Sequence, residues 1–267
     1  MKKSMLFIWA AILVLSAACD DSESKYTAAA PSSAVASMSP AVSLPATSPS
    51  AILLPAVSSP AAASPEASSF PLPEGTVEDM SIRAVGEHPS GQILVQPASL
   101  ATRAPLGSPS CYGQETDLGW RGDYEAVWQT GDGAKPVGVF TFPADFEIIQ
   151  RKSDTVKMEK HTLGDTDIFT YVPRYTDCHG LETYLFGVSG KEAFPISLKM
   201  DSERVLTRLS HLPNRSVQWK NEEMIITGGY GAGQEFISVY HFHYDPKERS
   251  MILKTTDLVS PNDIYKD

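Results

Sequence analysis

Residues 236–244 read Phe-Ile-Ser-Val-Tyr-His-Phe-His-Tyr, and this stretch indicates the fold class most clearly. Successive side chains of a strand point to opposite faces. Phe236, Ser238, Tyr240, Phe242 and Tyr244 therefore share one face of a predicted strand, while Ile237, Val239, His241 and His243 share the other. Residues 245–249 (Asp-Pro-Lys-Glu-Arg) form a turn, and residues 251–254 return as the next strand.

Short runs of β-branched and aromatic residues, separated by turn residues, continue in the N-terminal direction. The runs 124–129 and 137–142 flank Gly131-Asp132-Gly133, which predicts a hairpin. Further strands are expected at residues 82–85, 92–95, 168–172, 183–188, 196–200, 205–209, 216–219 and 224–227. The strongest helical alternative is residues 205–212. The fold class is therefore mostly β, an antiparallel β-sandwich or barrel.

Composition divides the chain into three parts. Residues 28–73 hold 13 Ala, 12 Ser and 9 Pro, with Glu66 as their single charge, which predicts a disordered linker with an O-glycosylated stalk as the alternative. We expect a signal peptide at residues 1–18, Cys19 and the linker at 19–75, and one β-rich domain at 76–267. Residues 111–257 are its most firmly predicted part.

The first residues have the order of an export signal. Lys2 and Lys3 precede an apolar run from Met5 to Leu15, and three small residues follow. A plain secretory signal, or an uncleaved anchor, would have the same order.

With Cys19 next, residues 15–19 (Leu-Ser-Ala-Ala-Cys) resemble the lipobox of a bacterial lipoprotein. The family prefers Leu three residues before the Cys, where this chain has Ser16. The resemblance covers only this N-terminal stretch. It implies cleavage before Cys19, acylation of Cys19 and an anchor in the lipid bilayer, with the domain facing the periplasm or the cell exterior. Asp20 resembles the inner-membrane retention signal of diderm lipoproteins.

The charge balance narrows the class of partner. The 267 residues include 22 Lys and Arg against 32 Asp and Glu. Loss of Lys2 and Lys3 with the signal leaves 20 basic against 32 acidic residues, a formal charge of −12. We therefore expect no nucleic-acid binding, because that function needs a clustered basic surface.

With Cys19 acylated, Cys111 and Cys178 remain as a pair in an oxidising compartment, which predicts a disulfide. Two buried free thiols are the alternative. A catalytic Cys178 beside His179 is disfavoured, because adjacent residues of an extended chain point to opposite faces.

Two further motifs have both a functional and a structural interpretation. His241, His243 and Asp245 share one strand face and form a weak candidate metal site, which would need His161, His179 or His211 to complete it. Without a third ligand they are ordinary strand residues. Gly229, Tyr230, Gly231 and Gly233 belong to the densest glycine run, which predicts a hairpin and, as the weaker alternative, a ligand-facing loop.

The sequence names no reaction. We find no Gly-x-Ser-x-Gly, Ser-x-x-Lys or His-Glu-x-x-His motif, and we expect no cofactor. The expected function is a membrane-anchored lipoprotein whose β-rich domain binds an envelope protein, a wall polymer or a small ligand. The alternatives are a cell-envelope hydrolase with a spatially assembled His and carboxylate site, and a scaffolding lipoprotein without a ligand. The domain's many Trp and Tyr residues suit sugar or peptide recognition if they are exposed.

Overall fold

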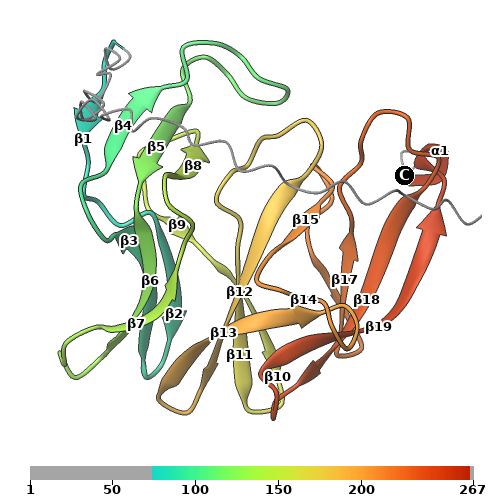
Figure 1. Ribbon diagram of the computed structural model, residues 1–267. Helices are drawn as coiled ribbons and strands as arrows, with labels where there is room; N and C mark the ends of the chain where they lie inside the picture. The colour runs from blue at the N-terminus through green and yellow to red at the C-terminus, as the bar shows by residue number, and fades with distance from the viewer. Residues whose placement is uncertain (1–73, 265–267) are drawn as a thin grey trace, which may run out of the picture. The chain divides into compact units, whose positions relative to one another are not determined.

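A computed structural model describes residues 74–264, all within one compact unit of the chain (Figure 1). The signal peptide, Cys19 and the Pro/Ala/Ser-rich residues 28–73 lie outside the described residues. The described part holds three sheets and one four-residue helix, α1 (Pro261–Ile264). No helix within residues 74–264 has the length and apolar character that a membrane crossing requires.

Two smaller sheets come mainly from the N-terminal half of this unit. The four-stranded sheet has the order β1 (Val77–Glu78), β4 (Thr102–Pro105), β5 (Leu118–Gly122) and β8 (Phe146–Gln150). The five-stranded sheet has the order β7 (Val137–Thr141), β6 (Tyr124–Thr130), β3 (Gly91–Pro97), β2 (Ala84–His88) and β9 (Val156–Lys157). All these pairings are antiparallel except that of β2 with β9.

The ten-stranded sheet curves into a nearly closed barrel. Its main path runs through β10 (Glu159–Leu163), β11 (Thr166–Tyr171), β12 (Leu181–Ser189), β13 (Glu192–Lys199), β19 (Ser250–Val259), β18 (Ile237–Asp245), β17 (Glu223–Thr227) and β16 (Gln218–Lys220). Beside this path, β14 (Val205–Leu206) pairs with β13, and β15 (Leu209–His211) pairs with β12. An isolated bridge from His211 to Gly228 connects β15 to the end of β17. The pairings of β12, β13, β19, β18, β17 and β15 thus form a closed circuit.

The mostly β fold class is therefore confirmed, with antiparallel sheets and a nearly closed barrel. The predicted hairpin at residues 124–142 is present as β6 and β7. The helical alternative at residues 205–212 is wrong, because this segment forms β14 and β15 instead. Four strands precede Cys111, so the range 111–257 omits β1 to β4, which belong to the same sheets as later strands.

Strand β12 is the wall between two hydrophobic cores. Its side chains alternate: Tyr184, Phe186 and Val188 pack in one buried cluster, and Leu185 packs in the other. The neighbouring β11 divides in the same way, with Phe169 in the first cluster and Ile168 in the second. A strand that is buried on both faces has apolar residues at successive positions. Residues 183–188 therefore do not alternate between apolar and polar side chains.

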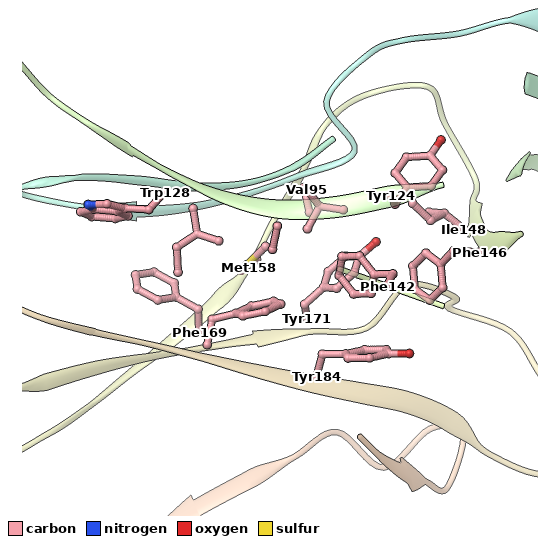
Figure 2. Packing of buried hydrophobic residues seen from close by; sticks show 14 of the residues in the cluster. Val95, Tyr124, Trp128, Phe142, Phe146, Ile148, Met158, Phe169, Tyr171 and Tyr184 are labelled. Atoms are coloured by element: carbon pink, nitrogen blue, oxygen red, sulfur yellow. The ribbon is translucent and has the colours of Figure 1, made fainter. Parts of the chain in front are cut away.

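The first cluster is rich in aromatic rings (Figure 2). The rings of Phe142 and Phe146 stack with centroids 4.4 Å apart, and Tyr184 meets Phe142 edge-on at 5.0 Å. Gly86 on β2 leaves room for Phe169 of β11, because a Cβ atom on Gly86 would lie 2.7 Å from that ring. These contacts join the five-stranded sheet to the barrel wall.

Candidate functional site

One cavity in the described part of the chain has a volume of about 590 Å³. It lies where three segments meet: the approach to β12, strand β15, and the connection from β17 to β18. This volume is in the range of small-molecule sites. The residues that line it are Asp177, His179, Gly180, Glu182, Arg208, Leu209, Ser210, Gly228, Gly229, Tyr230, Gly231, Gln234, Phe236, Ser238 and Tyr240.

The glycine run forms one wall of this cavity. It connects the antiparallel strands β17 and β18, as the sequence predicts for a hairpin. Of the four ligand-loop candidates, Gly229, Tyr230 and Gly231 line the cavity. Gly233 does not line it and instead has a φ of +84°, which favours glycine in the turn.

Backbone hydrogen bonds hold this loop against the other two segments. The Tyr230 N–H donates to the His179 carbonyl at 2.8 Å, and the Gly229 N–H donates to the Ser210 carbonyl at 3.2 Å. A Cβ atom on Gly229 would lie 2.7 Å from the His179 carbonyl oxygen. The close approach that Gly229 permits is therefore to the chain's own backbone, and not to a ligand as the ligand-loop hypothesis supposed.

An ion pair provides the strongest charges in the cavity. Glu182 accepts from Arg208 at 2.8 Å, and the Tyr184 hydroxyl donates to the same carboxylate at 3.2 Å. Burial, and then the nearby Glu182, raise the pKa of Tyr184 to about 12, so the phenol stays a neutral donor. Asp177 lies 3.9 Å from Arg174 and accepts the His179 N–H at 2.9 Å. Each carboxylate of the cavity thus has an arginine close by.

Aromatic side chains lie along the β17–β18 side of the cavity. Phe236 is 50% exposed, whereas Tyr230 and Tyr240 are half-buried. Tyr230 also packs against the small cluster that contains Leu212 and Ile264. Other aromatic residues that the sequence offered for recognition are buried in the core: Trp120, Trp128, Tyr124, Tyr171 and Tyr184.

Cys111 and Cys178 lie at disulfide distance, with Cα atoms 5.4 Å apart. Both residues are exposed, and Cys178 directly precedes the cavity residue His179. The Tyr112 N–H also donates to the Thr176 hydroxyl at 3.2 Å, so more than the cysteines fixes this segment. The cysteine pair therefore anchors the chain that enters the cavity wall.

The candidate metal ligands do not converge. His241 Nδ1 lies 3.2 Å from Glu223, and its Nε2 lies 3.2 Å from Asp257 on the opposite side of the ring. Carboxylates at opposite ring nitrogens cannot share one ion with this imidazole. His243 is exposed, and Asp245 accepts the Lys247 N–H at 2.8 Å in the turn that follows.

The remaining histidines do not complete a metal site with these residues. His161 stacks on Trp219, His211 is buried beside Thr183 at 2.7 Å, and His179 lines the cavity. Within residues 74–264, no three His, Cys, Asp or Glu side chains are grouped so that they could hold a metal ion. His241, His243 and Asp245, which we would expect to act in the hydrolase alternative, are not among the cavity residues.

Sequence reasoning missed Glu182, Arg208, Ser210 and Phe236 as cavity residues. Glu182 and Ser210 are register partners of β12 and β15, strands whose pairing depends on a bend near residues 207–208. Phe236 lies between the glycine run and β18, and nothing in its local sequence marks it as a cavity residue. Comparison with protein-family models, curated proteins and solved structures returned no match for this chain.

Proposed function

We propose that this chain is an envelope lipoprotein that is acylated at Cys19 and binds a ligand in the cavity between β12, β15 and the β17–β18 connection. The domain is a binding module, and residues 28–73 are the spacer that carries it away from the bilayer. At about 3.1 Å per residue, a spacer of this composition reaches on the order of 140 Å.

The cavity is the single observation that carries the binding proposal. It combines a volume of about 590 Å³, within the range of small-molecule sites, with three aromatic side chains beside a more polar wall. Its walls are held by the hydrogen bonds from Tyr230 and Gly229, so the cavity is formed before any ligand arrives. This rigidity supports binding over a scaffold without a ligand.

Thermal unfolding of the full chain, purified in detergent with its cysteines oxidised, tests this proposal. The panel contains purified wall fragments, neutral and charged oligosaccharides, short peptides, nucleotides and divalent metals. A ligand at 100 times its Kd adds about 2.7 kcal/mol, which raises Tm by about 5–10 °C for a domain of this size.

Two variants locate any ligand that the panel finds. Ser210→Trp places a bulky side chain at an exposed position of the cavity wall and should abolish the shift. Ser202→Trp, at an exposed turn position that does not line the cavity, should keep it. No shift with any compound, or equal shifts in both variants, would overturn the cavity as the binding site.

The anchor is tested separately. Cys19→Ser should abolish incorporation of a labelled fatty acid and move the protein from the membrane fraction to the soluble fraction. Persistence of the label in this variant would overturn acylation at Cys19.

A further inference from the structure

We infer that the cavity binds a neutral saccharide and that Phe236 is the aromatic residue against which a sugar ring packs. This inference rests on the proposed function, because it names the class of ligand for the same cavity.

The charges of the cavity argue against a charged ligand. Its one Arg, Arg208, is already bonded to Glu182 at 2.8 Å, and no Lys lines the cavity. Asp177 has Arg174 within 3.9 Å. Within the cavity lining, an anion would therefore have to compete with Glu182 for the one arginine, and a cation would have to compete with Arg208 for Glu182. Arg174 is shared between Asp177 and Glu147, which lies 3.4 Å from it.

The remaining surface is amphipathic. Tyr230, Phe236 and Tyr240 line the side formed by the β17–β18 connection, and Glu182, Arg208 and Ser210 line the side formed by β12 and β15. A pyranose ring has apolar C–H faces and a polar edge of hydroxyl groups. Its faces fit aromatic rings, and its hydroxyls both donate to carboxylates and accept from a guanidinium.

Phe236 is the exposed aromatic residue of the cavity lining. Half of its surface is exposed, and it belongs to none of the buried clusters of the described residues. Tyr230, in contrast, packs against Leu212 and Ile264, and Tyr240 packs against the barrel core. Phe236 is therefore the aromatic residue of the cavity lining whose ring is accessible to pack against a sugar face.

Calorimetric titration of the full chain in detergent tests the ligand class. The neutral probes are tetra-N-acetylchitotetraose and cellotetraose, and the charged probes are tetragalacturonate and tetralysine. We expect a neutral tetrasaccharide to bind the parent protein. Phe236→Ala should weaken this binding about tenfold, whereas Phe236→Trp, which keeps an aromatic ring, should bind about as tightly as the parent. The matched control is Leu258→Ala, which removes a side chain that is 65% exposed on β19 and does not line the cavity.

Pelleting with purified peptidoglycan separates two sources of the same chemistry. If the protein pellets and a neutral tetrasaccharide releases it, the ligand is a wall glycan. If the tetrasaccharide binds without pelleting, the ligand is a free sugar. Either result supports a saccharide site.

Three results would overturn the inference. If only tetralysine or tetragalacturonate binds and Ser210→Trp blocks it, the ligand class is wrong and the binding function stands. If a neutral sugar binds equally to Phe236→Ala and Leu258→Ala, the assignment of Phe236 is wrong. If no probe binds and the thermal panel is also silent, the proposed function fails together with the inference.

Discussion

The imidazole ring of His161 stacks on the indole ring of Trp219, with centroids 4.3 Å apart and ring planes inclined by 10°. His161 lies on β10 and Trp219 on β16, the first and last strands of the eight-strand path. These two strands are not hydrogen-bonded neighbours in the sheet. Side-chain stacking therefore connects the two end strands of this path, which the backbone ladder does not pair.

This stack should contribute measurably to the free energy of unfolding. In a double-mutant cycle of His161→Ala and Trp219→Ala, we expect a coupling energy of about 0.5–1.5 kcal/mol, which urea denaturation would measure. His243→Ala, at an exposed position of the same sheet, should change stability by less than about 0.5 kcal/mol. Strictly additive effects of the two substitutions would show that the stack does not hold the edges together.

Gly86→Ala should destabilise the contact between the five-stranded sheet and the barrel. The new Cβ atom would lie 2.7 Å from the Phe169 ring, which is 1% exposed and has little room to move. We expect a loss of about 1–3 kcal/mol in the free energy of unfolding by urea denaturation. Gly138→Ala on β7 is the control, because nothing lies within 4 Å of its Cβ position. Equal stabilities of the two variants would contradict this packing.

Acid should destabilise the fold through His211. Burial lowers the pKa of this imidazole below its ordinary 6.5, although a hydrogen bond with the Leu181 backbone opposes the shift. The unfolded chain then binds a proton on His211 more readily than the folded protein does. The stability that this group contributes is present above the ordinary pKa of 6.5 and falls as the pH drops below that value.

Urea unfolding at about pH 7.5 and about pH 5.5 would measure this loss, since the two values bracket the ordinary pKa of histidine. His211→Gln should reduce the difference between the two pH values, and His243→Gln, at an exposed position, should leave it unchanged. An undiminished difference in His211→Gln would assign the acid sensitivity to other groups.

Reduction of the Cys111–Cys178 disulfide should lower the stability of the domain by up to about 4 kcal/mol, the chain-entropy value for a closed loop of this length. The Tyr175 hydroxyl donates to Asp117, and the Tyr112 N–H donates to Thr176, so the two segments remain together in the folded reduced protein. Most of the loss therefore arises in the unfolded chain. Reductant should lower Tm of the parent and leave Tm of the Cys111→Ser/Cys178→Ser variant unchanged; an insensitive parent would exclude a stabilising disulfide.

Glu222→Gly should stabilise the β16–β17 hairpin. Asn221 and Glu222 form its two-residue loop with φ values of +51° and +64°, as in a type I′ turn. A left-handed conformation costs a side-chain-bearing residue about 1–2 kcal/mol, whereas the entropic cost of Gly is about 0.5–1 kcal/mol. We therefore expect a net gain of about 0.5–1 kcal/mol by urea denaturation. Glu203→Gly, in a turn without positive φ at this residue, should give no gain.

The sequence was most informative where one face of a strand is buried. The alternation in residues 236–244 predicted a strand, which is present as β18, and Phe242 and Tyr244 are buried on one of the two predicted faces. The hairpin around Gly131-Asp132-Gly133 was also predicted correctly, because the turn residues and the flanking β-branched and aromatic runs both indicate a hairpin. Where β12 is buried on both faces, its continuous apolar run still indicated a strand but not which core each residue enters.

The site was less predictable because it is built from distant segments. The glycine run was the one part of the cavity with a local signal. Its partners Glu182, Arg208 and Ser210 come together only through the pairing of β12 with β15. That pairing depends on a bend near residues 207–208, and the sequence there contains no residue typical of a turn. His241 and His243 show the opposite case, since a correct strand face suggested a shared ion that the opposed positions of Glu223 and Asp257 do not permit.

The two-sided burial of β12 also governs how this architecture can change over generations. Recombination of the gene on either side of this strand would separate the two parts of the domain. One product would expose the aromatic cluster that β12 covers, and the other would lack strands of the barrel. The N-terminal sheets and the barrel must therefore be inherited together, and new specificity must arise by exchange of loops such as residues 228–236. We therefore expect β12 to tolerate few substitutions, although it provides only Glu182 to the cavity.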